Sequence, residues 1–458
     1  MGKYHAYQVY EDTHNEFVSE LPQGWVLSKF KYEVDYVEGP GILANDFHEA
    51  GIPLLRIQNV KDRFTSGDIK TYLDPQKVKD KWEHFKTKTG DLLISGSAST
   101  DLVTEVTEQY EGAVPYTGLI RLRAKQDRTD KNYVRYFVQS ELFKNQIENL
   151  KTGSTIQHFG PIHLQQIVYP SALASEQTQI ANFLDHETAK IDTLIEKQQQ
   201  LIKLLKEKRQ AVISHAVTKG LNPQAPMKDS GVERLGKVPE HWKVVPLKYL
   251  CRFSGGGTPS KDNLSYWTNG TTPWVSPKDM KTFWIEKTQD YVTDIAVKES
   301  STNLVEKGAL LMVVRSGILQ RTIPIAINTV PVTLNQDMKA LRFNNRMLAT
   351  FASDYILGNV DKLLLEWSKE GATVESIEHE YLANGLFPVP PIVEQRQIVE
   401  ALTQQKERFD ELEGKAIVGI KLLQERRTAL ISAAVTGKID VRNWQAPTSQ
   451  NQELEQTA

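Results

Sequence analysis

Residues 254–261, SGGGTPSK, have the composition of a nucleotide-binding loop, with three glycines followed by hydroxyl groups and a lysine. A phosphate-binding P-loop ends in Gly-Lys followed by Ser or Thr, but Lys261 is preceded by a serine. A dinucleotide-binding loop needs a third glycine after two spacer residues, where this stretch has Pro259 and Ser260. Two interpretations stay open: a tight turn between strands, or a turn whose Thr258, Ser260 and Lys261 contact a DNA phosphate.

Other catalytic patterns are incomplete as well. The Pro-Pro pair in PVPPIVEQ lacks the Asp/Asn-Pro-Pro-aromatic context of an adenine methyltransferase. Asp410 with the nearby Glu-Gly-Lys resembles part of a metal-nuclease site, but no second acidic cluster accompanies it. His158 and His163 have no third ligand at zinc spacing. The sequence therefore predicts recognition or assembly, with no catalytic site, metal or cofactor in this chain.

Polar loops suited to nucleic acid follow the expected strands of two mixed segments. Arg, Gln and Asn can make paired hydrogen bonds with base edges, whereas Lys and hydroxyl groups mainly contact phosphates. Each residue alone is more typical of a solvated loop, but their recurrence at matching places favours DNA binding. The candidate DNA-binding residues are Arg56, Gln58, Asn59, Lys61, Ser95, Ser97, Ser99, Ser154, Thr155 and Gln157 in the first segment, and Thr258, Ser260, Lys261, Lys278, Arg315, Ser316, Gln320, Arg321, Asn335 and Gln336 in the second.

These segments belong to one unit that the sequence contains twice. EQTQIANFL, from Glu176, recurs as EQRQIVEAL from Glu394, and LLKEKRQAVISHAVTKG, from Leu204, recurs as LLQERRTALISAAVTGK from Leu422, both at an offset of 218 residues. LPQGW, ending at Trp25, recurs one residue off that spacing as VPEHW. Such a long period indicates a duplicated molecule with pseudo-two-fold symmetry rather than a solenoid.

The charged segment at the end of each copy is predicted to be a long helix. Apolar residues recur there at alternating spacings of three and four, as in a heptad seam. Each seam needs a partner, so we expect the two helices to pair as an antiparallel coiled coil; a dimerisation coiled coil is the alternative. A helix of about 43 residues spans about 65 Å and would hold the mixed segments apart. The expected helix-pairing residues are Leu184, Ile191, Leu194, Leu201 and Leu205 in the first copy, and Leu402, Phe409, Leu412 and Leu423 in the second.

Short strands, turns and one or two helices alternate in the mixed segments, which predicts an α+β fold class for two similar globular domains. The expected division is an N-terminal extension (1–20), a first mixed domain (21–170), a helical spacer (171–220), a linker (221–237), a second mixed domain (238–388), a second helical spacer (389–442) and a disordered polar tail (443–458).

Composition limits the environment and the partners. The chain has 458 residues, a formal net charge of -2 and one cysteine, Cys251. The near-neutral charge predicts that any polyanion site is a local patch, and the single cysteine excludes an internal disulfide. No apolar run approaches the length of a membrane span, so we expect a cytoplasmic protein without membrane contact.

The duplication and its motifs resemble the specificity subunit of type I restriction-modification systems. YPSALASEQTQIANFLD and FPVPPIVEQRQIVEALT each lead into a long helix that ends RQAVISHAVTKG or RTALISAAVTGK. GGGTPSKDNLSYWTNGTTPWVSPKDM is similar to the opening of many target-recognition domains of that family. The resemblance covers about residues 20 to 442. The first domain departs from the pattern, because VEGPGILAND stands where the second has SGGGTPSK.

The resemblance implies a DNA-binding subunit without catalytic activity. Each mixed domain would read one half of a split target in double-stranded DNA, and the helices would set the spacer between the halves. Two modification subunits would bind S-adenosylmethionine and methylate adenine, and motor-nuclease restriction subunits would use ATP and Mg. An alternative is an assembly scaffold or inactive paralogue that binds methyltransferase subunits without reading DNA, and a third is an enzyme with an unrecognised site.

Overall fold

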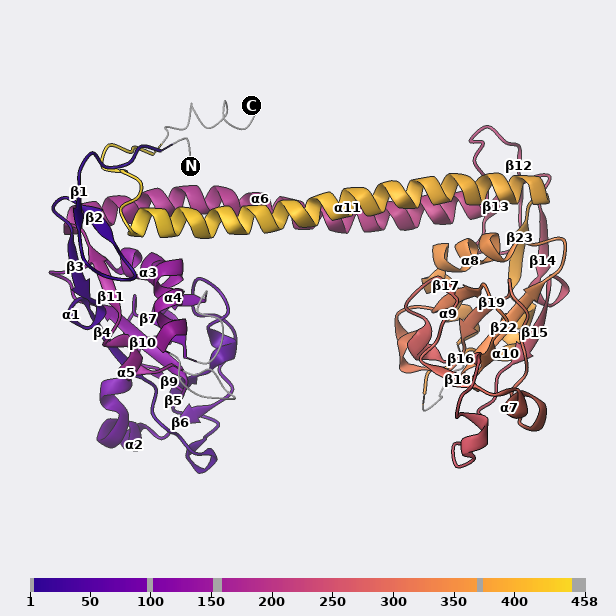
Figure 1. The fold of residues 1–458 in the computed structure, drawn as a ribbon, viewed down its shortest axis with the longest axis horizontal. Helices are drawn as coiled ribbons and strands as arrows, with labels where there is room; N and C mark the ends of the chain where they lie inside the picture. The colour runs from indigo at the N-terminus through magenta and orange to yellow at the C-terminus, as the bar shows by residue number, and fades with distance from the viewer. Residues whose placement is uncertain (1–3, 97–101, 151–158, 369–373, 447–458) are drawn as a thin grey trace. The chain divides into compact units, whose positions relative to one another are not determined.

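The computed structural model describes residues 4–96, 102–150, 159–368 and 374–446, which form two compact units (Figure 1). Unit 1 comprises Met1–Gln199 with Ile417–Ala458, and unit 2 comprises Gln200–Ala416. Each unit therefore combines one mixed domain with parts of both long helices. Most of the predicted polar tail, residues 447–458, lies outside the described residues.

Unit 1 is built on a four-stranded antiparallel sheet, and a smaller three-stranded sheet in the same domain contains one parallel pair. Aromatic side chains pack between the larger sheet, the helices that follow it and both long helices; Phe137 and Tyr169 are fully buried there. The larger sheet has the order β4 (Val34–Glu38), β10 (Leu119–Ala124), β7 (Leu92–Ser95), β8 (Val103–Glu105), and the smaller has the order β6 (Tyr72–Leu73), β5 (Ile52–Leu55), β9 (Val114–Pro115). The helices of this domain are α1 (Phe30–Glu33), α2 (Pro75–Lys77), α3 (Lys131–Gln139), α4 (Glu141–Leu150) and α5 (Pro161–Leu164).

Unit 2 has the same plan with one strand more at the edge of its main sheet. Trp242, Phe351 and Leu402 bring the domain and the long helices into one buried cluster. The main sheet has the order β15 (Cys251–Gly255), β22 (Met338–Phe343), β19 (Leu310–Val313), β20 (Ile325–Asn328), β17 (Trp284–Ile285), and the small sheet has the order β18 (Asp290–Val292), β16 (Thr272–Val275), β21 (Thr333–Leu334). The helices are α7 (Asp294–Glu299), α8 (Ala349–Gly358), α9 (Val360–Trp367) and α10 (His379–Asn384). The α+β fold class is thus confirmed.

A two-stranded ribbon leads from each domain into its long helix. β3 (Val26–Lys29) pairs with β11 (Val168–Ser171), and β14 (Lys243–Pro246) pairs with β23 (Leu386–Val389). The duplication also extends upstream of these ribbons. β1 (Tyr10–Asp12) pairs with β2 (Glu20–Pro22) in the same register in which β12 (Met227–Asp229) pairs with β13 (Lys237–Pro239). The segments expected as an extension and a linker therefore have corresponding structures.

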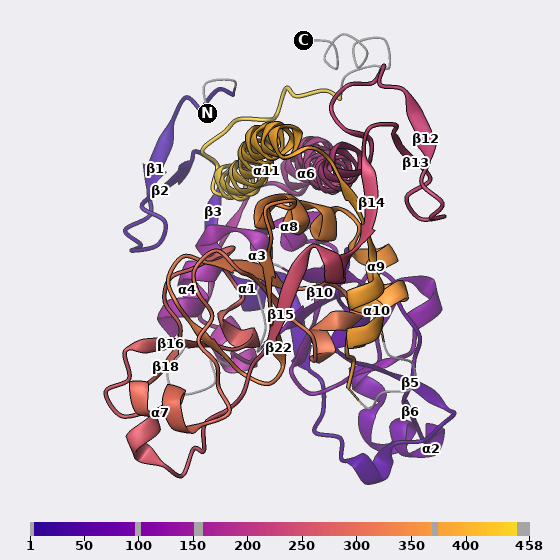
Figure 2. The same cartoon turned by 90° about the vertical axis from the view of Figure 1, so that its right-hand side faces the viewer.

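The two long helices are α6 (Ala174–Lys219) and α11 (Ile392–Val435), with 46 and 44 residues. Figure 2 shows them end-on and side by side. In unit 2, Arg209 pairs with Asp410 and Lys206 with Glu413, so numbers rise along one helix as they fall along the other. The helices are therefore antiparallel, as predicted. No helix in the described part of the chain combines the length and apolarity that a membrane crossing requires.

Glycine ends both long helices. Gly220 and Gly437, directly after the final turns, have φ values of 78° and 70°. This left-handed conformation favours glycine and closes the helix C-terminus.

The seam between the helices differs from the predicted one by one residue in every second position. Leu184, Ile191, Leu205, Leu402, Phe409 and Leu423 are buried or half-buried. Leu194, Leu201 and Leu412 are instead 46, 43 and 40% exposed. Their half-buried neighbours are Ile195, Ile202 and Glu413. Because Leu194 and Leu201 are each followed by an isoleucine, the sequence allows two apolar stripes, and packing against the partner helix selects the second.

Candidate nucleic-acid interface

Four strand ends meet at one edge of the domain in unit 2. β15 ends with Gly255 opposite Lys339, and β19 ends with Val313 opposite Met338, both near the start of β22. β16 ends beside Leu334 of β21, just ahead of the turn into β22. Since successive loops leave from this edge, the topology brings together the candidates near residues 258–261, 278, 315–316 and 335–336.

SGGGTPSK is a tight connection packed against that turn. The Gly257 N–H donates to the Leu334 carbonyl at 2.8 Å, and the Trp274 indole N–H donates to the Gly257 carbonyl at 3.1 Å. A Cβ on Gly256 would lie 1.9 Å from the Asn335 carbonyl oxygen. The glycines are therefore required for close backbone approach. Thr258 contacts the Gln336 side chain.

The exposed end of this connection carries Ser260 and Lys261. The Ser260 carbonyl accepts a hydrogen bond from the Trp267 indole at 3.0 Å, which fixes the backbone while both side chains face solvent. A phosphate could thus be contacted only by the end of the loop, beyond its glycines.

Lys278 is presented by a short turn after β16. The Ser276 backbone N–H and hydroxyl donate to the Asp279 carboxylate at 2.9 and 2.8 Å, which closes the 3₁₀ turn Pro277–Asp279. The lysine between them is exposed. This capping arrangement explains the residue types in WVSPKDM.

Arg315 lies at the same edge, with its Nε 2.9 Å from Asp337 Oδ1 and its side chain 59% exposed. The Ser316 hydroxyl accepts the first N–H of the turn Gly317–Gln320 and is half-buried. Asn335 is buried beneath the turn, with its N–H bonded to the Val275 carbonyl at 2.9 Å. Of these side chains, Arg315 is the one both charged and accessible.

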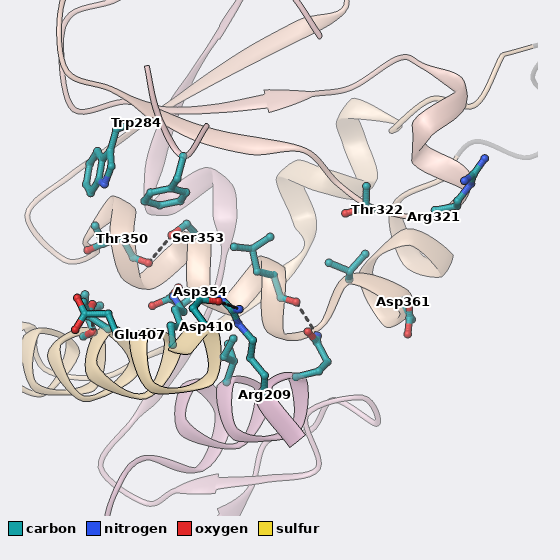
Figure 3. Close-up of a pocket in the computed structure, with 18 residues that line it drawn as sticks. Arg209, Trp284, Arg321, Thr322, Thr350, Ser353, Asp354, Asp361, Glu407 and Asp410 are labelled. Carbon is teal, nitrogen blue, oxygen red and sulfur yellow. Dashed lines mark hydrogen bonds and ion pairs between the residues drawn. The ribbon is translucent and has the colours of Figure 1, made fainter. Parts of the chain in front are cut away.

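Gln320 and Arg321 lie away from these loops. Arg321 lines a cavity with Trp284 and with residues of both long helices, as Figure 3 shows. Gln320 lines a different hollow beside Glu375 and Glu378. The structure therefore does not bring these two candidates together with Lys261 or Arg315.

The strand ends of unit 1 converge in the same way, although the loop sequences differ. β4 and β7 end beside the start of β10, and β5 ends beside β9. A Cβ on Gly39 would lie 2.2 Å from the Pro115 carbonyl oxygen, which is the relationship of Gly256 to Asn335 in unit 2. VEGPGILAND and SGGGTPSK thus share a close backbone approach at one glycine.

A turn after β5 corresponds to the one that presents Lys278. The Arg56 N–H donates to Asn59 Oδ1 at 3.1 Å, and the Asn59 amide donates to the Ser66 carbonyl at 3.2 Å. Asn59 is buried and holds the loop, whereas Gln58 and Lys61 are exposed.

Aromatic rings fix the arginine of this turn. The Arg56 guanidinium lies 5.0 Å from the ring centroid of Tyr116 and 5.3 Å from that of Phe47, both cation–π distances. Ser95 is buried in β7. The candidates Ser97, Ser99, Ser154, Thr155 and Gln157 lie outside the described residues.

Sequence analysis did not select Tyr116, Phe47 or Lys339. Tyr116 occupies the place of Asn335, ahead of the central strand, and no polar run marks it. Lys339 stands within a strand pattern; burial lowers its pKa, against an opposing effect of Glu378. Burial likewise lowers the pKa of His379, and the Lys339 charge lowers it further. No group of three or more His, Cys, Asp or Glu side chains in the described ranges is arranged to hold a metal ion.

Duplicated domains with converging polar loops, joined to paired long helices, define a class of DNA-specificity proteins, and comparison with known proteins agrees. Residues 239–422 match the family described as the type I restriction modification DNA specificity domain. The specificity subunit of the type I restriction enzyme EcoR124I/EcoR124II of Escherichia coli is 39% identical over 179 residues, which cover 39% of this chain and 43% of that protein. This match therefore spans less than half the length of that relative.

Other similarities extend over nearly the whole chain. The putative MjaX specificity subunit of Methanocaldococcus jannaschii is 23% identical over 93% of this chain and 96% of its own length. A chain from a solved structure of a type I R-M system has 16% identity and a TM-score of 0.70 over 92% of this chain and 99% of its own, which shows the shared fold. The chain belongs to the specificity subunits of type I restriction-modification systems, and the predicted resemblance is confirmed.

Proposed function

We propose that this chain is the non-catalytic DNA-specificity subunit of a type I restriction-modification enzyme, with each mixed domain reading one half of a bipartite target. The observation that carries the proposal is a common loop frame with different side chains. Gln58 and Lys278 are exposed at corresponding places in the turns after β5 and β16, while Tyr116 and Asn335 occupy corresponding places ahead of the central strand. Two readers on one framework with different loops suit two different half-sites.

The long helices would set the distance between the half-sites and would offer docking surfaces to two modification subunits. Those subunits would bind S-adenosylmethionine and methylate adenine, and motor-nuclease subunits using ATP and Mg would complete the restriction enzyme. This chain would hold none of these cofactors and would act in the cytoplasm. The E. coli and M. jannaschii relatives named as specificity subunits support this assignment.

Methylation mapping tests the proposal. Genomic DNA is sequenced for modified adenine from cells that express this chain with its modification subunit. The expected result is a split motif with an adenine methylated in each half. A short continuous motif would contradict bipartite reading. Methylation of DNA by the purified chain alone would contradict a non-catalytic role. A complex that forms but methylates without sequence preference would favour the scaffold alternative.

Helix length tests the spacer. Seven residues inserted after Gln199 and seven after Ile417, which are corresponding positions, lengthen both helices by about 10 Å while keeping the heptad phase. At about 34 Å per DNA turn, the methylated motif should gain about three unspecified base pairs. An unchanged spacer would exclude the helices as its determinant.

A further inference from the structure

Each mixed domain is fixed to the start of its own long helix by a charged contact, and in unit 1 the domain supplies the cation. Arg135 on α3 donates to Asp185 Oδ1 on α6 at 2.5 Å. The Arg135 side chain is only 4% exposed. The Tyr136 hydroxyl donates to the same carboxylate oxygen at 2.8 Å. The helix therefore supplies the anion that this buried arginine requires.

In unit 2 the polarity of the contact is reversed. Lys406 on α11 forms an ion pair with Asp354 on α8. Here the carboxylate is the buried partner, with its side chain 4% exposed. The domain therefore supplies the anion and the helix the cation.

The two ion pairs occupy neighbouring, non-identical positions of the repeat. At the offset of 218 residues, Arg135, Tyr136, Asp185 and Thr188 correspond to Ser353, Asp354, Thr403 and Lys406. Each ion pair thus corresponds to a neutral pair in the other unit. Tyr136 and Thr188 share a hydrogen bond of 3.2 Å in unit 1. In unit 2, Ser353 and Thr403 bond to carbonyls of their own helices at 2.6 and 2.8 Å.

Packing a domain against the other helix would leave buried charges of one sign together. The first domain on α11 would bring Arg135 near Lys406, with no carboxylate at either repeat position. The second domain on α6 would bring Asp354 near Asp185, with no cation at either position. An uncompensated buried charge is strongly destabilising, whereas a matched pair is tolerated.

We propose that the reversed ion pairs are a pairing code, so that each mixed domain packs only on a helix that carries the complementary charge. The unit of this protein that can be exchanged with another copy or a relative is then a domain together with about the first four turns of its helix, through Thr188 or Lys406. A domain transferred without those turns would meet the wrong charge.

Unit 2 has room for a direct test. Ser353 and Asp354 line a cavity of about 710 Å³ together with Thr403 and Lys406 (Figure 3). The corresponding cavity of unit 1, which Arg135 lines, measures about 210 Å³. An arginine introduced at position 353 therefore has space, and its effect reports charge rather than overpacking.

The experiment gives the second domain the code of the first in the full-length chain. The variant S353R/D354Y faces the native Thr403 and Lys406, and the thermal stability of unit 2 is followed through labelling of its only cysteine, Cys251. Its midpoint should fall by roughly 5–10 °C. Adding T403D/K406T, which supplies the code of α6, should restore at least half of the loss. Adding T403A/K406A instead, a neutral helix, should restore clearly less.

The proposal is overturned if T403D/K406T gives no recovery, or if the neutral helix restores as much. The reciprocal variant in unit 1, R135S/Y136D with and without D185T/T188K, repeats the test in the other direction with the midpoint of global unfolding. Recovery there requires the lysine on α6, and its absence would also overturn the code.

Discussion

Gln177 and Gln395, 218 residues apart, are both fully buried and make the same hydrogen bonds in their two units. Gln177 Oε1 accepts from the Asp130 N–H at 3.0 Å, and its amide donates to the Ala172 carbonyl at 2.8 Å. Gln395 Oε1 accepts from the Leu348 N–H at 2.9 Å, and its amide donates to the Pro390 carbonyl at 2.9 Å. The second glutamine in each of EQTQ-type motifs, counted from the glutamate, is exposed or half-buried, so the first is the structural one.

Replacement of Gln395 by leucine should destabilise unit 2 by about 3 kcal/mol, because buried backbone groups of Leu348 and Pro390 lose their partners. Urea unfolding of the full chain, followed through Cys251 reactivity, measures the change. Gln404→Leu is the control, since Gln404 is exposed on the same helix and should shift stability by less than about 0.5 kcal/mol. Equal effects of both substitutions would contradict a structural role of the buried carboxamide.

Neighbouring glycines of SGGGTPSK should respond differently to alanine. Gly256→Ala places a methyl group against the Asn335 carbonyl and should cost about 3 kcal/mol or displace the loop. Gly255→Ala has no atom within 4 Å of the new Cβ and should be well tolerated. Thermal unfolding of the two variants checks the difference. A tolerated alanine at 256 would show that close approach does not explain this glycine.

The large-scale organisation could be predicted from sequence because a long exact offset and a heptad-like spacing survive in the residues that pack. The choice between Leu194 and Ile195 in the seam could not, because both are apolar and only the partner helix distinguishes them. Similarly, LPQGW and VPEHW revealed the start of the repeat, but the preceding strands β1 and β12 pair through backbone groups and share little sequence.

The candidate interface was predictable by loop and not by residue. Polar residues after strands pointed to the correct edge of each domain, yet Asn59 and Asn335 are buried and hold their turns. Whether an amide faces the backbone or the solvent depends on a turn closed by a residue three positions away, which composition does not disclose. The equivalence of Gly39 and Gly256 was hidden because it depends on a carbonyl from a distant strand.

Cys251 should react with a thiol reagent only when unit 2 opens. The thiol is buried, and burial raises its pKa to about 12. Between the ordinary pKa of about 9 and this value, the unfolded chain loses the proton while the folded chain keeps it, so stability falls as pH rises through this range and is unaffected below it. The labelling rate at pH 7.5 with and without denaturant measures protection. Fast labelling of the native chain would contradict burial.

Arg315→Ala should weaken binding to the cognate half-site of the second domain by about tenfold or more, since an arginine at a base edge contributes about 1–3 kcal/mol. The effect should be confined to that half of the target, because the first domain is unchanged. Binding of the complex with modification subunits to oligonucleotides mutated in either half measures it. Lys307→Ala, at the opposite end of β19 and also exposed, is the matched control. An equal loss for both variants would indicate general electrostatics.

Lys261→Ala separates the two interpretations of SGGGTPSK. If the exposed end of the loop touches a phosphate, binding should weaken to a similar degree for cognate and altered sequences, and the dependence of log K on log salt should lose about one unit of slope. The glycines would be unaffected, so unfolding should match that of the unaltered chain. Titrations at several salt concentrations, with Lys307→Ala as control, measure the slope. An unchanged slope would leave the stretch as a turn whose glycines serve packing alone, and a loss restricted to one base sequence would place Lys261 at a base edge instead.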